Sequence, residues 1–109
     1  MRNATQYANG TVTGTGEDIP VNCGFIPRKV KLMNITGKCV LEWNDQMADG
    51  YGYKIPTGID ATADTVSIHS YITTGGITKG TRTTLLGFII GTDADINAIA
   101  ESIIYEAWE

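Results

Sequence analysis

Residues 29–44 read KVKLMNITGKCVLEWN, and this stretch decides the fold. In its first half, Val30, Leu32 and Asn34 alternate with a second set of side chains that contains two lysines. Its second half alternates in the same way, with Cys39 and Trp43 in the apolar set. Thr36-Gly37-Lys38 between the halves is a tight-turn sequence. The stretch therefore predicts an antiparallel hairpin with one apolar face.

Short alternating segments continue on both sides of this hairpin. They are residues 11–16, 19–23, 51–54 and 64–71. Residues 86–91 are instead mainly apolar and predict a buried strand. Pro20 lies within residues 19–23, which favours a position at a sheet edge because proline cannot donate to a ladder. Gly75-Gly76 and other glycine-, proline- or asparagine-rich turns separate the segments. This pattern is typical of an all-β antiparallel domain, and we expect a β-sandwich or jelly-roll-like fold.

The chain has 109 residues, enough for one domain. With 42% hydrophobic and 18% charged residues, it has the composition of a globular protein of low charge. The first ten residues are polar and end in Asn9-Gly10. We therefore expect an N-terminal arm over residues 1–10 and a β-sandwich domain over residues 11–109.

Residues 93–108 carry two competing patterns. Ile96, Ile99 and Ile103 fit a helical stripe, and Thr92 with Asp95 resembles a capping box. In contrast, residues 102–108 are rich in β-branched and aromatic side chains. We favour a strand, which would cover an edge of the sheet, and helix is the alternative.

The charge balance argues against nucleic acid as a partner. Eight Lys and Arg face twelve Asp and Glu, giving a net charge of −4 and a pI near 4.8. Binding to phosphate needs a basic surface, so no nucleic-acid partner is expected. No apolar run approaches the roughly 20 residues that span a bilayer, and the first residues lack the apolar stretch of a signal peptide. We expect synthesis in a cytoplasm and no membrane partner.

The candidate metal ligands do not have the spacing of a known calcium or zinc site. Asp93, Asp95 and Asn97 match the first positions of a calcium loop, but Ala98 and Ile104 stand where glycine and a bidentate glutamate are needed. We predict a turn in which these side chains bind backbone N–H groups. Cys23 and Cys39 fit no zinc motif, and we expect two unpaired, buried thiols. No metal or cofactor is predicted.

No catalytic residue is predicted either. His69, the single histidine, has Ser67 about 7 Å along the same strand face, too far to act as its nucleophile, so we expect a surface histidine. Three glutamates, Glu42, Glu101 and Glu106, show no evident pairing across a cleft. We therefore expect a protein that is not an enzyme.

Four aromatic residues are the candidate interface. Trp43, Tyr51, Tyr53 and Trp108 suit three interpretations: core packing, anchoring of a protein contact, or stacking on sugar rings. The residues alone leave all three open.

Three blocks in this order resemble small virion proteins encoded among the head genes of tailed bacteriophages. They are residues 24–34, residues 41–43 with 47–50, and residues 87–97 with 105–108. The resemblance implies a structural protein of the virion: a capsid decoration (cement) protein or a head-fibre base. It implies assembly in the host cytoplasm, a place on the capsid surface, the major capsid protein as partner, and a homo-oligomer with the trimer favoured. It supplies no catalytic residues.

Two alternatives stand beside this hypothesis. One is a carbohydrate- or receptor-binding module of a head or tail fibre, which would use Trp43 or Tyr53. The other is a small glycan hydrolase, which would need two carboxylates, with Glu42 and Asp95 as the residues to test.

Overall fold

The computed structural model describes residues 6–37, 39–56, 59–60, 65–66 and 69–109. The described residues form strands and turns without a helix. The strands are β1 (Tyr7–Thr13), β2 (Ile19–Asn22), β3 (Lys29–Asn34), β4 (Cys39–Asn44), β5 (Tyr51–Pro56), β6 (Ile59–Asp60), β7 (Thr65–Val66), β8 (Ser70–Lys79), β9 (Gly87–Ile90) and β10 (Ser102–Trp108). The prediction of an all-β chain is confirmed.

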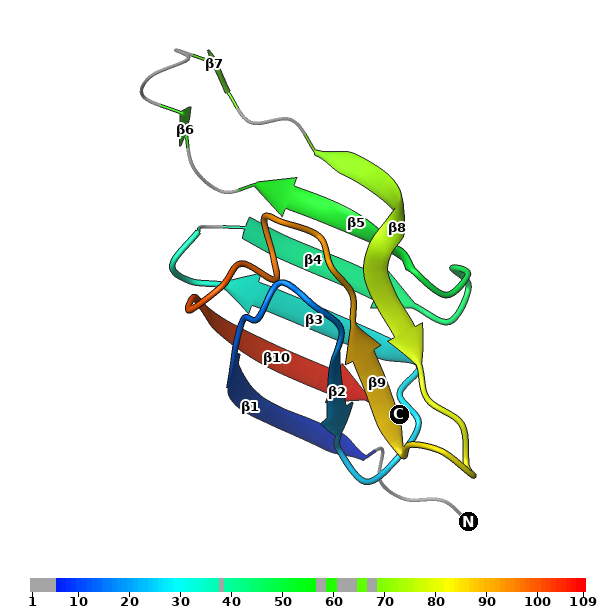
Figure 1. The fold of residues 1–109 in the computed structure, drawn as a ribbon. Helices are drawn as coiled ribbons and strands as arrows, with labels where there is room; N and C mark the ends of the chain where they lie inside the picture. Colours follow the sequence, from blue (N-terminus) through cyan, green and yellow to red (C-terminus); the bar gives the residue numbers. More distant parts are fainter. Residues whose placement is uncertain (1–5, 38, 57–58, 61–64, 67–68) are drawn as a thin grey trace.

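Eight of these strands form one curled antiparallel sheet in the order β1-β10-β3-β4-β5-β8-β9-β2 (Figure 1). β6 and β7 pair separately, at the far end of the molecule from β1. The predicted hairpin is β3–β4, with Lys29 opposite Asn44 and Asn34 opposite Cys39. The edge position predicted from Pro20 is also confirmed, because β2 is the last strand of the sheet.

β8 produces the curl of the sheet. Residues 70–72 pair with β5 and residues 77–79 pair with β9, and Ile77 lies opposite both Tyr51 of β5 and Ile90 of β9. Between Tyr51 and Gly52 of β5 the partner on β8 changes from Ile77 to Ile72, so residues 73–76 bulge out of the ladder. The predicted turn at Gly75-Gly76 is therefore wrong: these residues form a bend within one long strand. A Cβ at Gly76 would lie 2.1 Å from the Tyr51 carbonyl oxygen, so the bend requires glycine there.

The bend places β9 and β2 over one face of β10 and β3 (Figure 1). Phe88 of β9 meets Tyr105 of β10 edge to face, with ring centroids 5.7 Å apart. The core fills the space between the two layers. Its buried apolar side chains are Val21, Phe25, Val30, Leu32, Cys39, Leu41, Trp43, Ile77, Phe88, Ile90, Ile96, Ile103 and Ala107.

Two expectations about the chain ends need correction. Residues 7–10, expected in an arm, belong to β1 and pair with β10 from Tyr7 onward. They form a strand because they lie next to β10, a contact that the polar composition of the segment does not reveal. Residues 1–5 lie outside the described part. The C-terminal strand is confirmed as β10 over residues 102–108, but it lies between β1 and β3 instead of at an edge.

Candidate interaction surface

The cross-strand register divides the side chains of the sheet into two faces. The inner face carries Leu32, Leu41 and Trp43, and it is covered by β9, β2 and the segment of residues 91–101 (Figure 1). We call the opposite side of β1, β10, β3, β4, β5 and β8 the outer face. None of the described elements lies over it (Figure 1).

Three rows of paired residues cross the outer face. One row is mixed polar and aromatic: Asn9, Glu106, Lys31, Glu42, Tyr53 and Tyr71. A second is mainly apolar: Thr11, Ile104, Met33, Val40 and Ile55. The third is Tyr7, Trp108, Lys29 and Asn44. The four apolar side chains of the second row are only half-buried, so a partner could still remove apolar area from water there.

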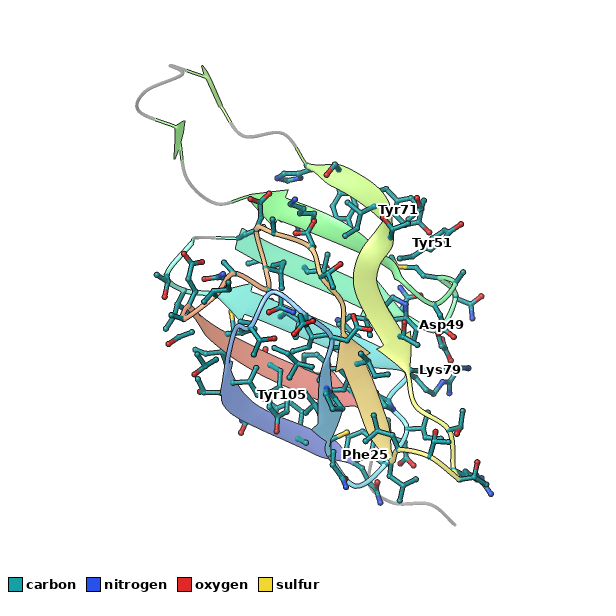
Figure 2. All side chains as sticks on the ribbon, in the orientation of Figure 1. Phe25, Asp49, Tyr51, Tyr71, Lys79 and Tyr105 are labelled. Atoms are coloured by element: carbon teal, nitrogen blue, oxygen red, sulfur yellow. The ribbon has the colours of Figure 1, made fainter. Side chains whose placement is uncertain are left out.

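The β5–β8 end of the outer face carries four rings, which we call the tyrosine cluster: Tyr51, Tyr53, His69 and Tyr71. Tyr51 and Tyr71 meet edge to face at 5.5 Å (Figure 2), and Tyr53 and His69 do so at 5.8 Å. The Tyr53 hydroxyl lies 3.4 Å from Nδ1 of His69. Tyr53 is 38% exposed and Tyr71 is 52% exposed. The rings therefore hold one another in place while leaving two aromatic faces available to a ligand.

A second aromatic pair lies at the other end of the outer face. Trp108 packs against Tyr7 with ring centroids 5.5 Å apart, and the Lys29 ammonium lies 5.0 Å from the Trp108 ring centroid. The Tyr7 hydroxyl donates a 2.7 Å hydrogen bond to Glu106, and this bond raises the pKa of the Tyr7 phenol. Trp108 is thus half-buried by its neighbours, with a cation on its face.

Trp43 does not belong to this surface. Only 1% of it is exposed, and its indole N–H donates to the Ala48 carbonyl at 3.3 Å. Of the interpretations open for this residue, core packing is the one that the structure supports, and the prediction of an interface role for Trp43 is wrong. The reason is its register: Trp43 lies opposite Val30, on the face that β9 covers.

The structure brings Tyr51 and Tyr53 together and leaves Trp108 three strands away on β10. The sequence predicted a surface histidine at His69, which is exposed, but it did not indicate that His69, Tyr71 and Tyr7 belong to this surface. A signal for the first two was present, because the alternation of residues 64–71 places His69 and Tyr71 on one side of a strand. The pairing of Tyr71 with Tyr53 and the ring contact of His69 with Tyr53 could not be predicted from the sequence. Ser67, which was considered as a nucleophile beside His69, lies outside the described residues.

The failed calcium loop is a structural turn, as predicted. Asp93 accepts a hydrogen bond from the Asp95 N–H at 3.2 Å. Asn97 is buried, and its side chain accepts from Thr15 and Gly16 N–H groups at 2.8 and 3.1 Å. The same side chain donates to the carbonyls of residues 17 and 91 at 2.6 and 2.8 Å. Asn97 therefore ties the 91–101 segment to the β1–β2 connection.

Both aspartates of that turn bind Lys54 of β5. The Lys54 ammonium lies 3.1 Å from Asp93 and 2.5 Å from Asp95. Burial acts to lower the pKa of Lys54, but the hydrogen bonds to Asp95 and Asp93 outweigh it, and the net pKa is raised. The pair of carboxylates is thus occupied by a cation of the chain itself. Among the residues described, no group of three His, Cys, Asp or Glu side chains could hold a metal ion.

The carboxylates considered as catalytic residues are spread over the molecule. Glu101 accepts from the buried Asn34 amide at 2.9 Å, and Glu106 binds Tyr7. Glu42 is on the outer face, whereas Asp95 binds Lys54 on the inner side, so these two carboxylates lie on opposite faces of the sheet.

Within the described residues, no helix is long and apolar enough to cross a membrane.

Both thiols are unpaired, as expected. Cys39 is buried on the inner face, and burial raises its pKa to about 11. Cys23 is only half-buried; burial raises its pKa as well, although its thiol also donates to the Phe25 carbonyl at 3.2 Å.

The chain matches no protein-family model, no curated protein and no solved structure.

Proposed function

We propose that this chain is a virion structural protein of a tailed bacteriophage, a capsid decoration protein that binds the lattice of the major capsid protein. The outer face carries this proposal: it is a sheet surface with a half-exposed apolar row and aromatic groups at both ends. Such groups are the usual anchors of protein contacts. The order of the three sequence blocks adds the bacteriophage context.

In the proposed contact, aromatic side chains at both ends of the outer face and the apolar row between them bind the partner. The tyrosine cluster supplies two exposed rings, and Ile104, Met33 and Val40 supply the row between the aromatic ends. Each contact alone need be only modest, because bridging neighbouring capsid subunits raises the effective concentration of each later contact. Within the all-β class, we place the chain nearest to β-sandwich modules, because Phe88 of one layer packs on Tyr105 of the other.

Copy number on purified virions tests the assignment. Quantitative mass spectrometry on virions of the phage that encodes the chain should find it in numbers comparable to the capsid lattice. A handful of copies would instead place it at a vertex, a fibre or the tail. If the chain is missing from virions, the proposal is wrong.

Variants of the outer face test the docking surface. Tyr53→Ala with Tyr71→Ala should weaken binding to purified, undecorated capsids by roughly tenfold or more, because exposed tyrosines are frequent hot spots. Ile99→Ala is the matched control, because Ile99 is 75% exposed on the 91–101 segment of the other side. Loss of binding in the control alone would assign docking to the inner-side loops.

A carbohydrate-binding module is the second candidate, and the tyrosine cluster is the observation that favours it. Its exposed rings suit stacking on sugar faces, and the Tyr53 and His69 polar atoms could bind hydroxyl groups. Trp43 no longer enters this hypothesis because it is buried. Binding on a glycan array that disappears in Tyr53→Ala, with the fold intact, would favour the module over a decoration protein.

A further inference from the structure

The two edges of the sheet differ in how they are protected. β2 has four residues, contains Pro20, and follows two acidic residues, Glu17 and Asp18. Proline and charge at an edge discourage pairing with another chain. β1 has seven residues, YANGTVT, with neither proline nor charge. The β1 edge is therefore the one open to another strand.

The hydrogen bonds at the ends of β1 show which backbone groups point outward. The Gly14 N–H donates to the Glu101 carbonyl at 2.8 Å, and the Glu109 N–H donates to the Gln6 carbonyl at 2.9 Å. The even-numbered residues of β1 thus bond to β10, since hydrogen-bonded positions alternate along an antiparallel strand. The odd-numbered residues, Tyr7, Asn9, Thr11 and Thr13, direct their N–H and C=O groups away from the sheet. Within the described part of the chain, no partner for these outward groups is found.

We propose that β1 pairs with β1 of a second copy of this chain, antiparallel and about a two-fold axis at Gly10. In this register Tyr7 lies opposite Thr13 of the second copy, and Asn9 lies opposite Thr11. All four outward-facing residues of each strand then find partners, giving about eight inter-chain hydrogen bonds. The two sheets become one continuous sheet, and their outer faces are joined.

A second copy fits this edge because the strand is self-complementary in that register. Polar, uncharged side chains oppose one another on the outer face, and half-buried Ala8 and Val12 oppose one another on the inner face. Each chain carries a net charge of −4, so two copies repel in general, but no charge lies on β1 itself. The contact is isologous and makes a dimer, in place of the trimer that the sequence resemblance implies.

Charge variants on the outer face of β1 test both the edge and the register. Asn9→Lys with Thr11→Lys places lysine opposite lysine across the axis and should weaken dimerisation by roughly tenfold or more at low salt. Asn9→Lys with Thr11→Glu is the matched variant: it places opposite charges face to face and should restore or strengthen the dimer. Sedimentation of the 109-residue chain over a concentration series gives the mass and the affinity.

A proline variant tests the backbone contribution. Thr11→Pro removes an outward N–H that bonds to nothing within the chain, so it should abolish the dimer while the monomer stays folded by circular dichroism. A wild-type chain that sediments as a monomer or a trimer overturns the proposal. So does a dimer that neither the lysine pair nor the proline affects. The proposal does not depend on the phage function, because particle binding and dimer mass are measured separately.

Discussion

The inner and outer faces of β3, β4 and β5 are built from the same alternating strands, but they differ in solvent exposure. Trp43 on the inner face is 1% exposed, whereas Tyr53 on the outer face of the next strand is 38% exposed. Both are aromatic residues in strands with an apolar alternation. The difference comes from β9 and β2, which the bend in β8 places over one face only. Whether an aromatic residue of this sheet belongs to the core or to the surface therefore depends on whether a strand far along the chain covers its face.

The largest expected effect separates these two aromatic residues. Trp43→Ala should lower the free energy of unfolding by about 4 kcal/mol, because it leaves a cavity in the packed core. Tyr53→Ala should cost less than about 1 kcal/mol, as an exposed substitution does. Urea unfolding followed by circular dichroism measures both. Equal losses in the two variants would contradict the division into faces.

Buried and exposed asparagines sharpen the same comparison. Asn97→Ala removes four part-buried hydrogen bonds made by a side chain that is 1% exposed, so we expect a loss of about 3 kcal/mol. Asn9→Ala on the outer face, which loses one exposed bond to Tyr7, should change stability by less than about 0.5 kcal/mol. Thermal unfolding of both variants is the measurement. A stable Asn97→Ala protein would show that the 91–101 segment is not held by this side chain.

The third comparison is between a lysine on the inner face and a lysine on the outer face, and it concerns the stability lost when each is replaced. Lys54→Met leaves the largely buried Asp93 carboxylate without its cation, at an expected cost of about 2 kcal/mol near neutral pH. Lys31→Met on the outer face should cost less than about 0.5 kcal/mol.

The pH dependence of the Lys54 contribution has a definite sign. The pKa of Lys54 is raised on folding, so its stabilisation is complete below the ordinary lysine pKa and is lost as the pH rises through the raised value. The difference between wild type and Lys54→Met should therefore shrink in strongly alkaline solution. A difference that grows with alkaline pH would contradict this assignment.

The smallest effect concerns reactivity and not stability. At pH 8 a thiol reagent should modify Cys23, which is half-buried, well before Cys39, whose pKa is raised to about 11 by burial on the inner face. Cys23→Ser and Cys39→Ser variants identify which thiol is labelled. Faster labelling of Cys39 than of Cys23 would mean that the inner face opens to solvent in the native protein.

The local alternation of residues was sufficient to predict much of the sheet. It predicted the β3–β4 hairpin, the buried β9 and the edge position of β2, because side-chain periodicity and the missing N–H of proline act within a few residues. It also set Tyr51 and Tyr53 on one face. The position of β10 inside the sheet was not predictable, since strand order is fixed by contacts between residues nearly a hundred positions apart.

By itself the sequence determined the class of fold, the acidic charge and the two-sided character of each strand. Only the tertiary structure decided which side became the core, that Gly75-Gly76 bends a strand instead of ending it, and that Tyr71 and His69 join Tyr51 and Tyr53. The physical reason is that alternation is encoded locally, whereas burial depends on which distant strand covers a face. For this chain, that strand is β9, brought over by the bend in β8.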